Sequence, residues 1–192
     1  MLTVIIPTRE SERALVQSLA PLVSGATAGL IAEVIVADAG SSDATAEVAD
    51  VAGCRYRAGV GAVGARLKAA AKEARASWLL FLRPGTVPEP GWIEAVENFI
   101  GSGRETTQAA IFRLRADDFA EPGLAAALRA LRAAMFGAAP TPAQGLLISR
   151  RLYDSLGGHD AGDEAEAGLL KRLGRGRLEL LSAAARPAGT DT

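Results

Sequence analysis

The residues with the clearest chemical potential are carboxylates and hydroxyls that follow a short apolar segment. The segment Val34-Ile35-Val36-Ala37 ends at Asp38, and the chain continues Ala39-Gly40-Ser41-Ser42-Asp43. A small, flexible turn of this kind presents Asp38 to an N–H group or a ribose hydroxyl of a ligand, while Asp43 caps the next helix. We therefore expect Asp38 to line a cleft, where Asp38→Asn weakens ligand binding with little loss of stability. The alternative is an ordinary strand-to-helix turn in which these residues only cap.

The elements around this turn alternate between short apolar runs and longer helical patterns. Strands are predicted at 2–6, 33–37, 54–57, 78–82, 109–114, 146–149 and 177–181. Helices are predicted at 11–23, 43–51, 64–76, 90–100 and 123–136, with two more between 149 and 177. Such alternation predicts a mainly parallel sheet with helices on both faces. Ligands bind outside the carboxyl ends of such strands, where segments 7–10, 38–43 and 83–86 fall.

Composition narrows the class of protein. The 192 residues fit one domain, and 49% of them are hydrophobic, which permits a sizeable core. The 21 basic and 22 acidic residues nearly balance, which argues against a nucleic-acid partner. One cysteine, Cys54, excludes an internal disulfide, and one histidine, His159, excludes a His-rich metal site. Because no apolar run is long enough for a spanning helix and no basic leader precedes the first strand, we expect a cytoplasmic protein.

A series of segments, taken in order, carries a family resemblance. These are Val4-Ile5-Ile6-Pro7-Thr8-Arg9-Glu10, the turn at Asp38, Gly61-Ala62-Val63-Gly64-Ala65-Arg66, Trp78-Leu79-Leu80-Phe81-Leu82, Pro88-Glu89-Pro90-Gly91-Trp92, Gln144-Gly145-Leu146-Leu147-Ile148-Ser149 and Leu156-Gly157-Gly158. Their order and spacing resemble family 2 glycosyltransferases of the GT-A fold, over about residues 2–181. The subgroup that the chain resembles most is the short cytoplasmic branch associated with radical-SAM and selenium-related genes.

The resemblance implies a GT-A-like, Rossmann-like α/β/α sandwich with a mainly parallel central sheet. It implies one domain over 1–187, with a nucleotide half at about 1–88, an acceptor half at about 89–187, and a frayed tail at 188–192. Asp38 matches the aspartate that contacts the nucleotide base in the family. Pro7, Thr8 and Glu10 are implied to line the nucleoside pocket.

The chain departs from the family at its metal site. The family usually carries an Asp-x-Asp or His-Ala-Asp motif after the fourth strand, whose aspartate holds Mn²⁺ or Mg²⁺ against the diphosphate. Here Gly85 stands at that aspartate's position, within Arg83-Pro84-Gly85-Thr86. A glycine side chain cannot ligate a cation, so we expect weak or absent metal binding at this place. Arg83 can instead contact a phosphate directly, because guanidinium groups suit bidentate phosphate contacts; the alternative is a solvated loop residue.

A second departure adds positive charge to a glycine-rich helix start. Where the family has an Arg-Gly-x-Gln-Leu-Asn pattern, this chain reads Val63-Gly64-Ala65-Arg66-Leu67-Lys68. Helix N-termini and glycine backbones can hold phosphate, which makes Gly64, Arg66 and Lys68 candidates for nucleotide binding. Arg66 and Lys68 are two residues apart, so at most one of them points into the cleft. Ordinary surface cations on an Ala-rich helix are the alternative.

The third departure concerns the general base. Inverting enzymes of this fold use a carboxylate to take the proton from the acceptor hydroxyl, and the family supplies it from a Glu-Asp pair that opens a helix. Here the region contains Asp163, Glu164 and Glu166. Aligning on Lys171-Arg172-Leu173 selects Glu166, whereas aligning on the acidic pair selects Asp163 and Glu164. Simple helix-start charges, which stabilise a helix through its dipole, are the alternative.

The resemblance predicts transfer of a sugar from a nucleotide-sugar donor to an acceptor, with inversion. The base, the sugar, the acceptor and the oligomeric state stay open. One alternative is a degenerate, non-catalytic relative that binds a nucleotide or a partner protein, which the missing metal ligand favours. Another is an unrelated α/β protein such as a nucleotidyltransferase-like binder. The pattern G-x-x-x-x-G-K-[ST] does not occur, so the sequence argues against a P-loop ATPase.

Overall fold

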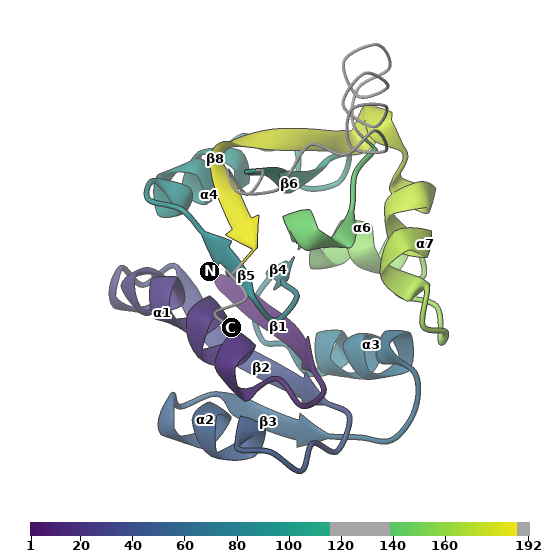
Figure 1. Ribbon diagram of the computed structural model, residues 1–192. Helices are drawn as coiled ribbons and strands as arrows, with labels where there is room; N and C mark the ends of the chain where they lie inside the picture. The colour runs from purple at the N-terminus through teal and green to yellow at the C-terminus, as the bar shows by residue number, and fades with distance from the viewer. Residues whose placement is uncertain (116–138, 188–192) are drawn as a thin grey trace, which may run out of the picture.

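The strands of the computed structural model, which describes residues 1–115 and 139–187, form one mixed sheet (Figure 1). Within the described residues the sheet has eight strands in the order β3-β2-β1-β4-β7-β6-β8-β5. They are β1 (Leu2–Thr8), β2 (Ile31–Asp38), β3 (Arg55–Ala58), β4 (Trp78–Phe81), β5 (Thr86–Pro88), β6 (Ala109–Leu114), β7 (Leu146–Ser149) and β8 (Leu178–Pro187). The predicted helix at 123–136 and the tail at 188–192 lie outside the described residues.

Strand direction divides the sheet. β3, β2, β1 and β4 are parallel, as predicted. β7 runs antiparallel to both β4 and β6, while β6 and β8 are parallel and β5 is antiparallel to β8. The parallel half therefore carries the three turns that were expected to meet at one sheet edge. Sequence patterns missed β5, because three residues that include a proline give no strand pattern.

Helices cover both faces of this sheet, which gives the expected α/β/α sandwich. α1 (Glu12–Thr27), α2 (Thr45–Val51) and α4 (Trp92–Ile100) lie on one face, and α3 (Val63–Glu73), α6 (Arg150–Ser155) and α7 (Ala165–Leu173) lie on the other (Figure 1). Two apolar clusters follow this division. One packs Leu15, Leu19 and Phe99 against the sheet, and the other packs Leu67 and Leu169.

Tertiary packing extends two elements beyond their predicted ends. α1 continues four residues past the expected end at Val23, and its last turn buries Gly25 where an added Cβ would lie 2.5 Å from the Trp92 ring. β8 runs to Pro187 rather than to Leu181, because its second part pairs with both β6 and β5. No helix of the described residues is long and apolar enough to cross a membrane.

Candidate active site

The ends of β1 and β2 place Thr8 beside Asp38. The two strands are parallel with Thr8 opposite Asp38, and the Thr8 hydroxyl donates to Asp38 Oδ1 at 2.7 Å. Asp38 also accepts from the Ser41 hydroxyl at 2.6 Å, from the backbone N–H groups of Gly40 and Ser41 at 2.7 and 2.6 Å, and from the Tyr56 hydroxyl at 2.8 Å. The side chain is fully buried. Our expectation that Asp38 lines a cleft is therefore wrong for this structure, because its two oxygens already bind five internal donors.

These donors keep Asp38 ionised. Burial alone raises the pKa of the Asp38 carboxyl, but the hydrogen bonds from Ser41, Thr8 and Tyr56 outweigh it and lower the pKa to about 2. Burial and the neighbouring Asp38 charge raise the pKa of Tyr56 to about 12. Sequence reasoning missed Tyr56 as a site residue. Its signal was available, since β3 was predicted and a parallel neighbour of β2 places its side chains near the end of that strand.

Glu10 joins the turn after β1 to the turn after β2. Its carboxylate accepts from the backbone N–H groups of Ser42 and Asp43 at 2.8 and 3.2 Å, just before α2. In return, Asp43 accepts from the backbone N–H of Glu12 at 3.1 Å, at the start of α1, and from that of Thr45 at 3.0 Å. Among the described residues Glu10 is the only non-glycine residue with a positive φ, 46°. The two turns are thus joined by hydrogen bonds, and Asp43 accepts from the first N–H group of α2, as predicted, although the N-cap residue itself is Ala44.

Arg66 reaches these strand ends from α3. Its Nη1 donates to the carbonyl oxygens of Ala37 and of Thr8, the latter at 3.2 Å. Its Nε is buried and has no hydrogen-bond partner among the described residues. Burial lowers the pKa of Arg66, while the charges of Asp38 and Asp163 raise it. The Arg66 Nε is therefore unpartnered but shielded, so a ligand at the strand ends reaches it only when its surroundings move.

Lys68 points elsewhere. Its Nζ donates to the carbonyl oxygen of Gly157 at 2.9 Å, and it lines a groove between α3 and α6 together with Lys72 and Arg150. The expectation that at most one of Arg66 and Lys68 faces the strand ends agrees with this arrangement. The placement of Lys68 does not support the nucleotide contact that we predicted for it.

Gly64 serves close packing at the start of α3. Its N–H donates to the Gly162 carbonyl oxygen at 3.2 Å, and the preceding N–H, that of Val63, donates to Asp163 Oδ1 at 3.3 Å. A Cβ at residue 64 would lie 1.9 Å from the Asp160 carbonyl oxygen and 2.3 Å from the Ala165 Cβ. The segment before α7 thus closes the start of α3, so the structure contradicts the expectation that a phosphate approaches Gly64.

Arg83 opens a tight turn after β4. The Thr86 N–H donates to the Arg83 carbonyl oxygen at 3.0 Å, and Gly85 has a φ of 82°. Proline followed by a glycine with positive φ is typical of a type II turn. The Gly85 N–H donates to the Ser18 hydroxyl at 2.8 Å, which fixes the turn against α1.

The Arg83 side chain binds Glu166, one of the three candidate bases. Arg83 Nε donates to both Glu166 oxygens at 3.2 and 3.0 Å, and Nη2 donates to Oε2 at 2.8 Å. This contact raises the pKa of Arg83. The Glu166 side chain is 12% exposed, whereas Asp163 and Glu164 are exposed. Glu166 is therefore the candidate base that is brought into contact with another predicted site residue.

His159 lies behind Glu166 in the protein core. The two residues border one small cavity with Phe81 and Leu170. The His159 N–H donates to the Tyr153 hydroxyl at 3.1 Å, so that hydroxyl's own proton is free to donate to Nδ1, 2.9 Å away. Burial lowers the pKa of His159 to about 4. The ring is thus neutral near pH 7.

The residues at the turn after β4 do not fit a divalent cation. Mn²⁺ and Mg²⁺ prefer oxygen ligands, but Gly85 has no side chain and Arg83 brings a positive charge. Within residues 1–115 and 139–187 no group of three or more His, Cys, Asp or Glu side chains could hold a metal ion.

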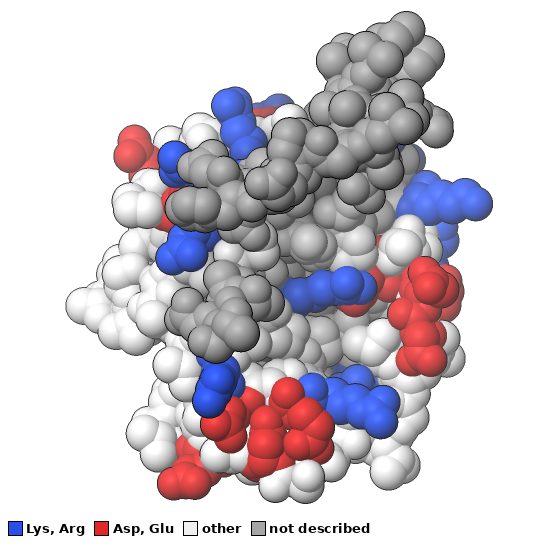
Figure 2. Space-filling view, viewed as in Figure 1, with Lys and Arg blue, Asp and Glu red and all other residues white. Residues whose placement is uncertain are grey.

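Figure 2 shows acidic and basic side chains next to one another over the end of β1 and the start of α3.

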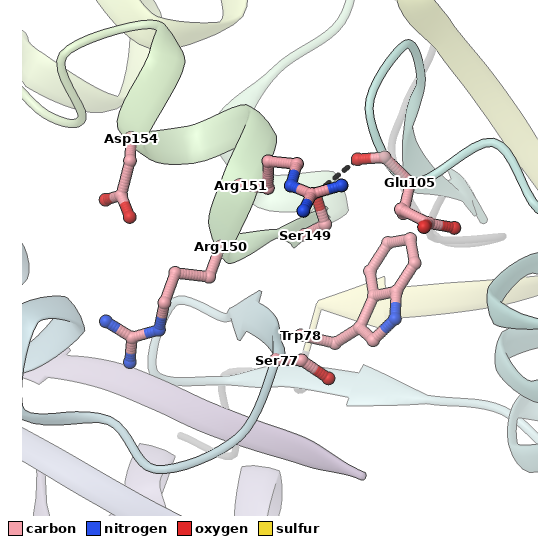
Figure 3. A pocket seen from close by; sticks show the side chains of 7 residues that line it. All are labelled: Ser77, Trp78, Glu105, Ser149, Arg150, Arg151 and Asp154. Carbon is pink, nitrogen blue, oxygen red and sulfur yellow. Dashed lines mark hydrogen bonds between the residues drawn. The ribbon is translucent and has the colours of Figure 1, made fainter.

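A separate cavity of about 730 Å³ opens at the other end of β4. It is lined by Ser77, Trp78, Glu105, Ser149, Arg150, Arg151 and Asp154. Figure 3 shows Arg150 and Arg151 pointing in different directions from the start of α6. None of the predicted site residues lines this cavity, so the candidate active site stays at the strand ends.

Known proteins share this fold and part of this sequence. The model of one protein family, Glycosyl transferase family 2, matches residues 3–136. Glucosyl-3-phosphoglycerate synthase from Mycobacterium tuberculosis, solved with Mn²⁺, UDP and glucosyl-3-phosphoglycerate, is 22% identical with a TM-score of 0.67, over 98% of this chain and 72% of that chain. Mannosyl-3-phosphoglycerate synthase from Rubrobacter xylanophilus is 18% identical with a TM-score of 0.74, over 100% and 67% of the two chains. Both likenesses show a shared fold. No curated protein matches the sequence significantly.

Proposed function

The chain belongs to glycosyl transferase family 2, whose members use nucleotide sugars, and we propose that it transfers the sugar with inversion and without a metal ion. The proposal that no metal ion is needed rests on the turn after β4, where Arg83 and Gly85 stand in place of oxygen ligands and Arg83 contacts Glu166. A fixed guanidinium can offset the charge of a departing diphosphate, as a metal ion does elsewhere.

In the proposed step, Glu166 takes the proton from the acceptor hydroxyl. The hydroxyl oxygen attacks the anomeric carbon of the sugar, and the bond from that carbon to the diphosphate oxygen breaks. The electron pair of the broken bond leaves with the diphosphate. Arg83 stabilises the charge that develops there, and Glu166 keeps the proton until solvent removes it. Asp163 and Glu164 are the less favoured bases, because both are exposed and neither contacts Arg83 by a hydrogen bond.

The nucleoside is proposed to bind at the ends of β1 and β2. Glu10 is exposed there and binds the facing turn, whereas Pro7, Thr8 and the unpartnered Nε of Arg66 are buried beneath it. Pro7 and Thr8 therefore support the site from below rather than line an open pocket. We propose that Asp38 acts on the base indirectly, by holding the turn at Ser41 in place. A direct contact between Asp38 and the base requires that one of its five donors be released.

The alternative is a relative that binds a nucleotide without transferring sugar. The replacement of the metal-binding aspartate by Gly85 favours it, because a diphosphate that is poorly neutralised leaves slowly. We also propose that the chain belongs to the short branch associated with radical-SAM and selenium-related genes, and that it is cytoplasmic.

The test is a screen of nucleoside diphosphates and nucleotide sugars by thermal shift and calorimetry, in EDTA and in Mn²⁺. Phosphoglycerate belongs in the acceptor set, because the two similar structures are synthases of its glycosides. Binding in EDTA together with release of nucleoside diphosphate supports the metal-independent enzyme. Binding without turnover supports the alternative. Binding that requires Mn²⁺ contradicts the proposed role of Arg83, and absence of any nucleotide binding contradicts both functions.

A further inference from the structure

The two groups that the proposed reaction needs are bound to each other in this structure. Arg83 follows β4 in the first half of the chain, and Glu166 lies in the first turn of α7, 83 residues later. Three hydrogen bonds join them, through Nε and Nη2 of the guanidinium. The pair bridges the nucleotide half and the acceptor half.

This pairing leaves each partner unfit for its proposed task. The Nε–Nη2 edge of an arginine is a bidentate edge that a phosphate also uses, and here a carboxylate occupies it. Both oxygens of the Glu166 carboxylate accept from the guanidinium, so neither is free to accept from an acceptor hydroxyl. A diphosphate that binds the same edge therefore has to displace Glu166.

We infer that Arg83 is exchanged between Glu166 and the donor diphosphate, so that donor binding releases Glu166 to act as the base. The inference rests on the proposed function and deepens it. It predicts that the donor binds before the acceptor is activated, and it assigns to Arg83 a second task beyond charge neutralisation.

The surroundings of Glu166 support a release of this kind. On the side away from solvent, Glu166 borders a small cavity whose other walls include Phe81, Leu146 and Leu170. Without its guanidinium partner, the carboxylate faces mostly hydrocarbon and the neutral His159 ring. Glu166 is thus engaged by Arg83 before donor binding, and its oxygens are free for the acceptor hydroxyl after it.

A double-mutant cycle on nucleoside diphosphate binding tests the exchange. Kd values for UDP and GDP are measured by calorimetry in EDTA, for the unmodified protein, Glu166→Gln, Arg83→Gln and the double variant. If the diphosphate and Glu166 compete, Glu166→Gln frees Arg83 and lowers the Kd by about five-fold, in the range of a half-exposed ion pair. In the Arg83→Gln background the same change should alter the Kd by less than about two-fold, because nothing remains to compete for.

Two controls separate this exchange from simple charge repulsion. Glu164 is an exposed neighbour whose charge acts on Arg83 without a hydrogen bond, so Glu164→Gln should change the Kd by less than about two-fold. Uridine and guanosine, which lack the diphosphate, should bind all variants alike. Equal tightening by Glu166→Gln in both backgrounds, or no tightening, overturns the exchange while nucleotide binding itself stands. If neither UDP nor GDP binds any variant, the proposed function fails and the exchange with it.

Discussion

The hydrogen bonds around Asp38 predict a stability role that can be measured. Asp38→Asn keeps the shape of the side chain but removes the charge that five donors share. The folded pKa of about 2 lies below the value of 3.8 for a free aspartate. That difference corresponds to about 2.5 kcal/mol of stability at neutral pH. Because the amide can still accept from Tyr56 and the backbone, we expect the free energy of unfolding to fall by about 2 kcal/mol.

The pH dependence of this loss follows from the direction of the pKa change. A lowered folded pKa means that the unfolded chain takes up the proton first as the pH falls. The contribution is therefore complete above pH 3.8 and disappears as the pH falls through about 2. At pH 3, about half of the difference between the variant and the unmodified protein should be gone.

Urea denaturation followed by tryptophan fluorescence measures this difference at pH 7 and pH 3. Trp78 and Trp92 are both buried and report on unfolding. Asp50→Asn is the matched control, because Asp50 is an exposed aspartate in the nearby helix α2, and it should change stability by less than about 0.5 kcal/mol. A loss at Asp38 as small as that of the control, or a loss that does not depend on pH, refutes the reasoning.

Three further predictions concern single positions. Gly64→Ala should lower the free energy of unfolding by about 1–3 kcal/mol through overpacking, whereas Gly162→Ala, with open space around its Cβ, should be nearly neutral in the same denaturation assay. Equal effects of the two variants would contradict the close approach of residue 64 to the segment before α7. Burial lowers the pKa of His159 from 6.5 to about 4, so the free energy of unfolding should fall by about 3 kcal/mol as the pH falls from 6.5 to 4. The dependence of stability on pH in His159→Gln should lack that fall, and identical dependences in the two proteins would argue against a neutral buried ring. Gly85→Asp should increase the affinity for Mn²⁺ in the presence of UDP, measured by calorimetry, at a cost of about 1 kcal/mol for an aspartate at a φ of 82°; unchanged Mn²⁺ affinity would argue that the diphosphate lies elsewhere.

The sequence was sufficient to predict the bounds of the strands that carry strong apolar patterns. β6 and β7 begin and end at the predicted residues, and the ends of β1 and β2 meet as the parallel arrangement requires. Strand patterns work here because the buried strands consist mostly of apolar residues. They also fix which residues stand at the ligand-binding edge of a parallel sheet.

The directions of the side chains could not be predicted from the sequence. Asp38 was placed at the right strand end, but whether its carboxylate faces a ligand or the internal donors depends on the conformation of the turn. Gly64 shows a similar ambiguity, since a glycine at a helix start suits both phosphate binding and close packing. The contact between Arg83 and Glu166 depends on how α7 is rotated against β4, which no local pattern records.

The affinity of the Arg83→Gln variant for UDP in EDTA tests the central claim most directly. If Arg83 takes the place of the metal ion, the unmodified protein binds UDP equally well in EDTA and in Mn²⁺. The variant should then bind UDP at least about ten-fold more weakly, as expected for the loss of a charged hydrogen bond, and should bind uridine unchanged. A requirement for Mn²⁺ in the unmodified protein, or an unchanged affinity of the variant for UDP, would contradict the account.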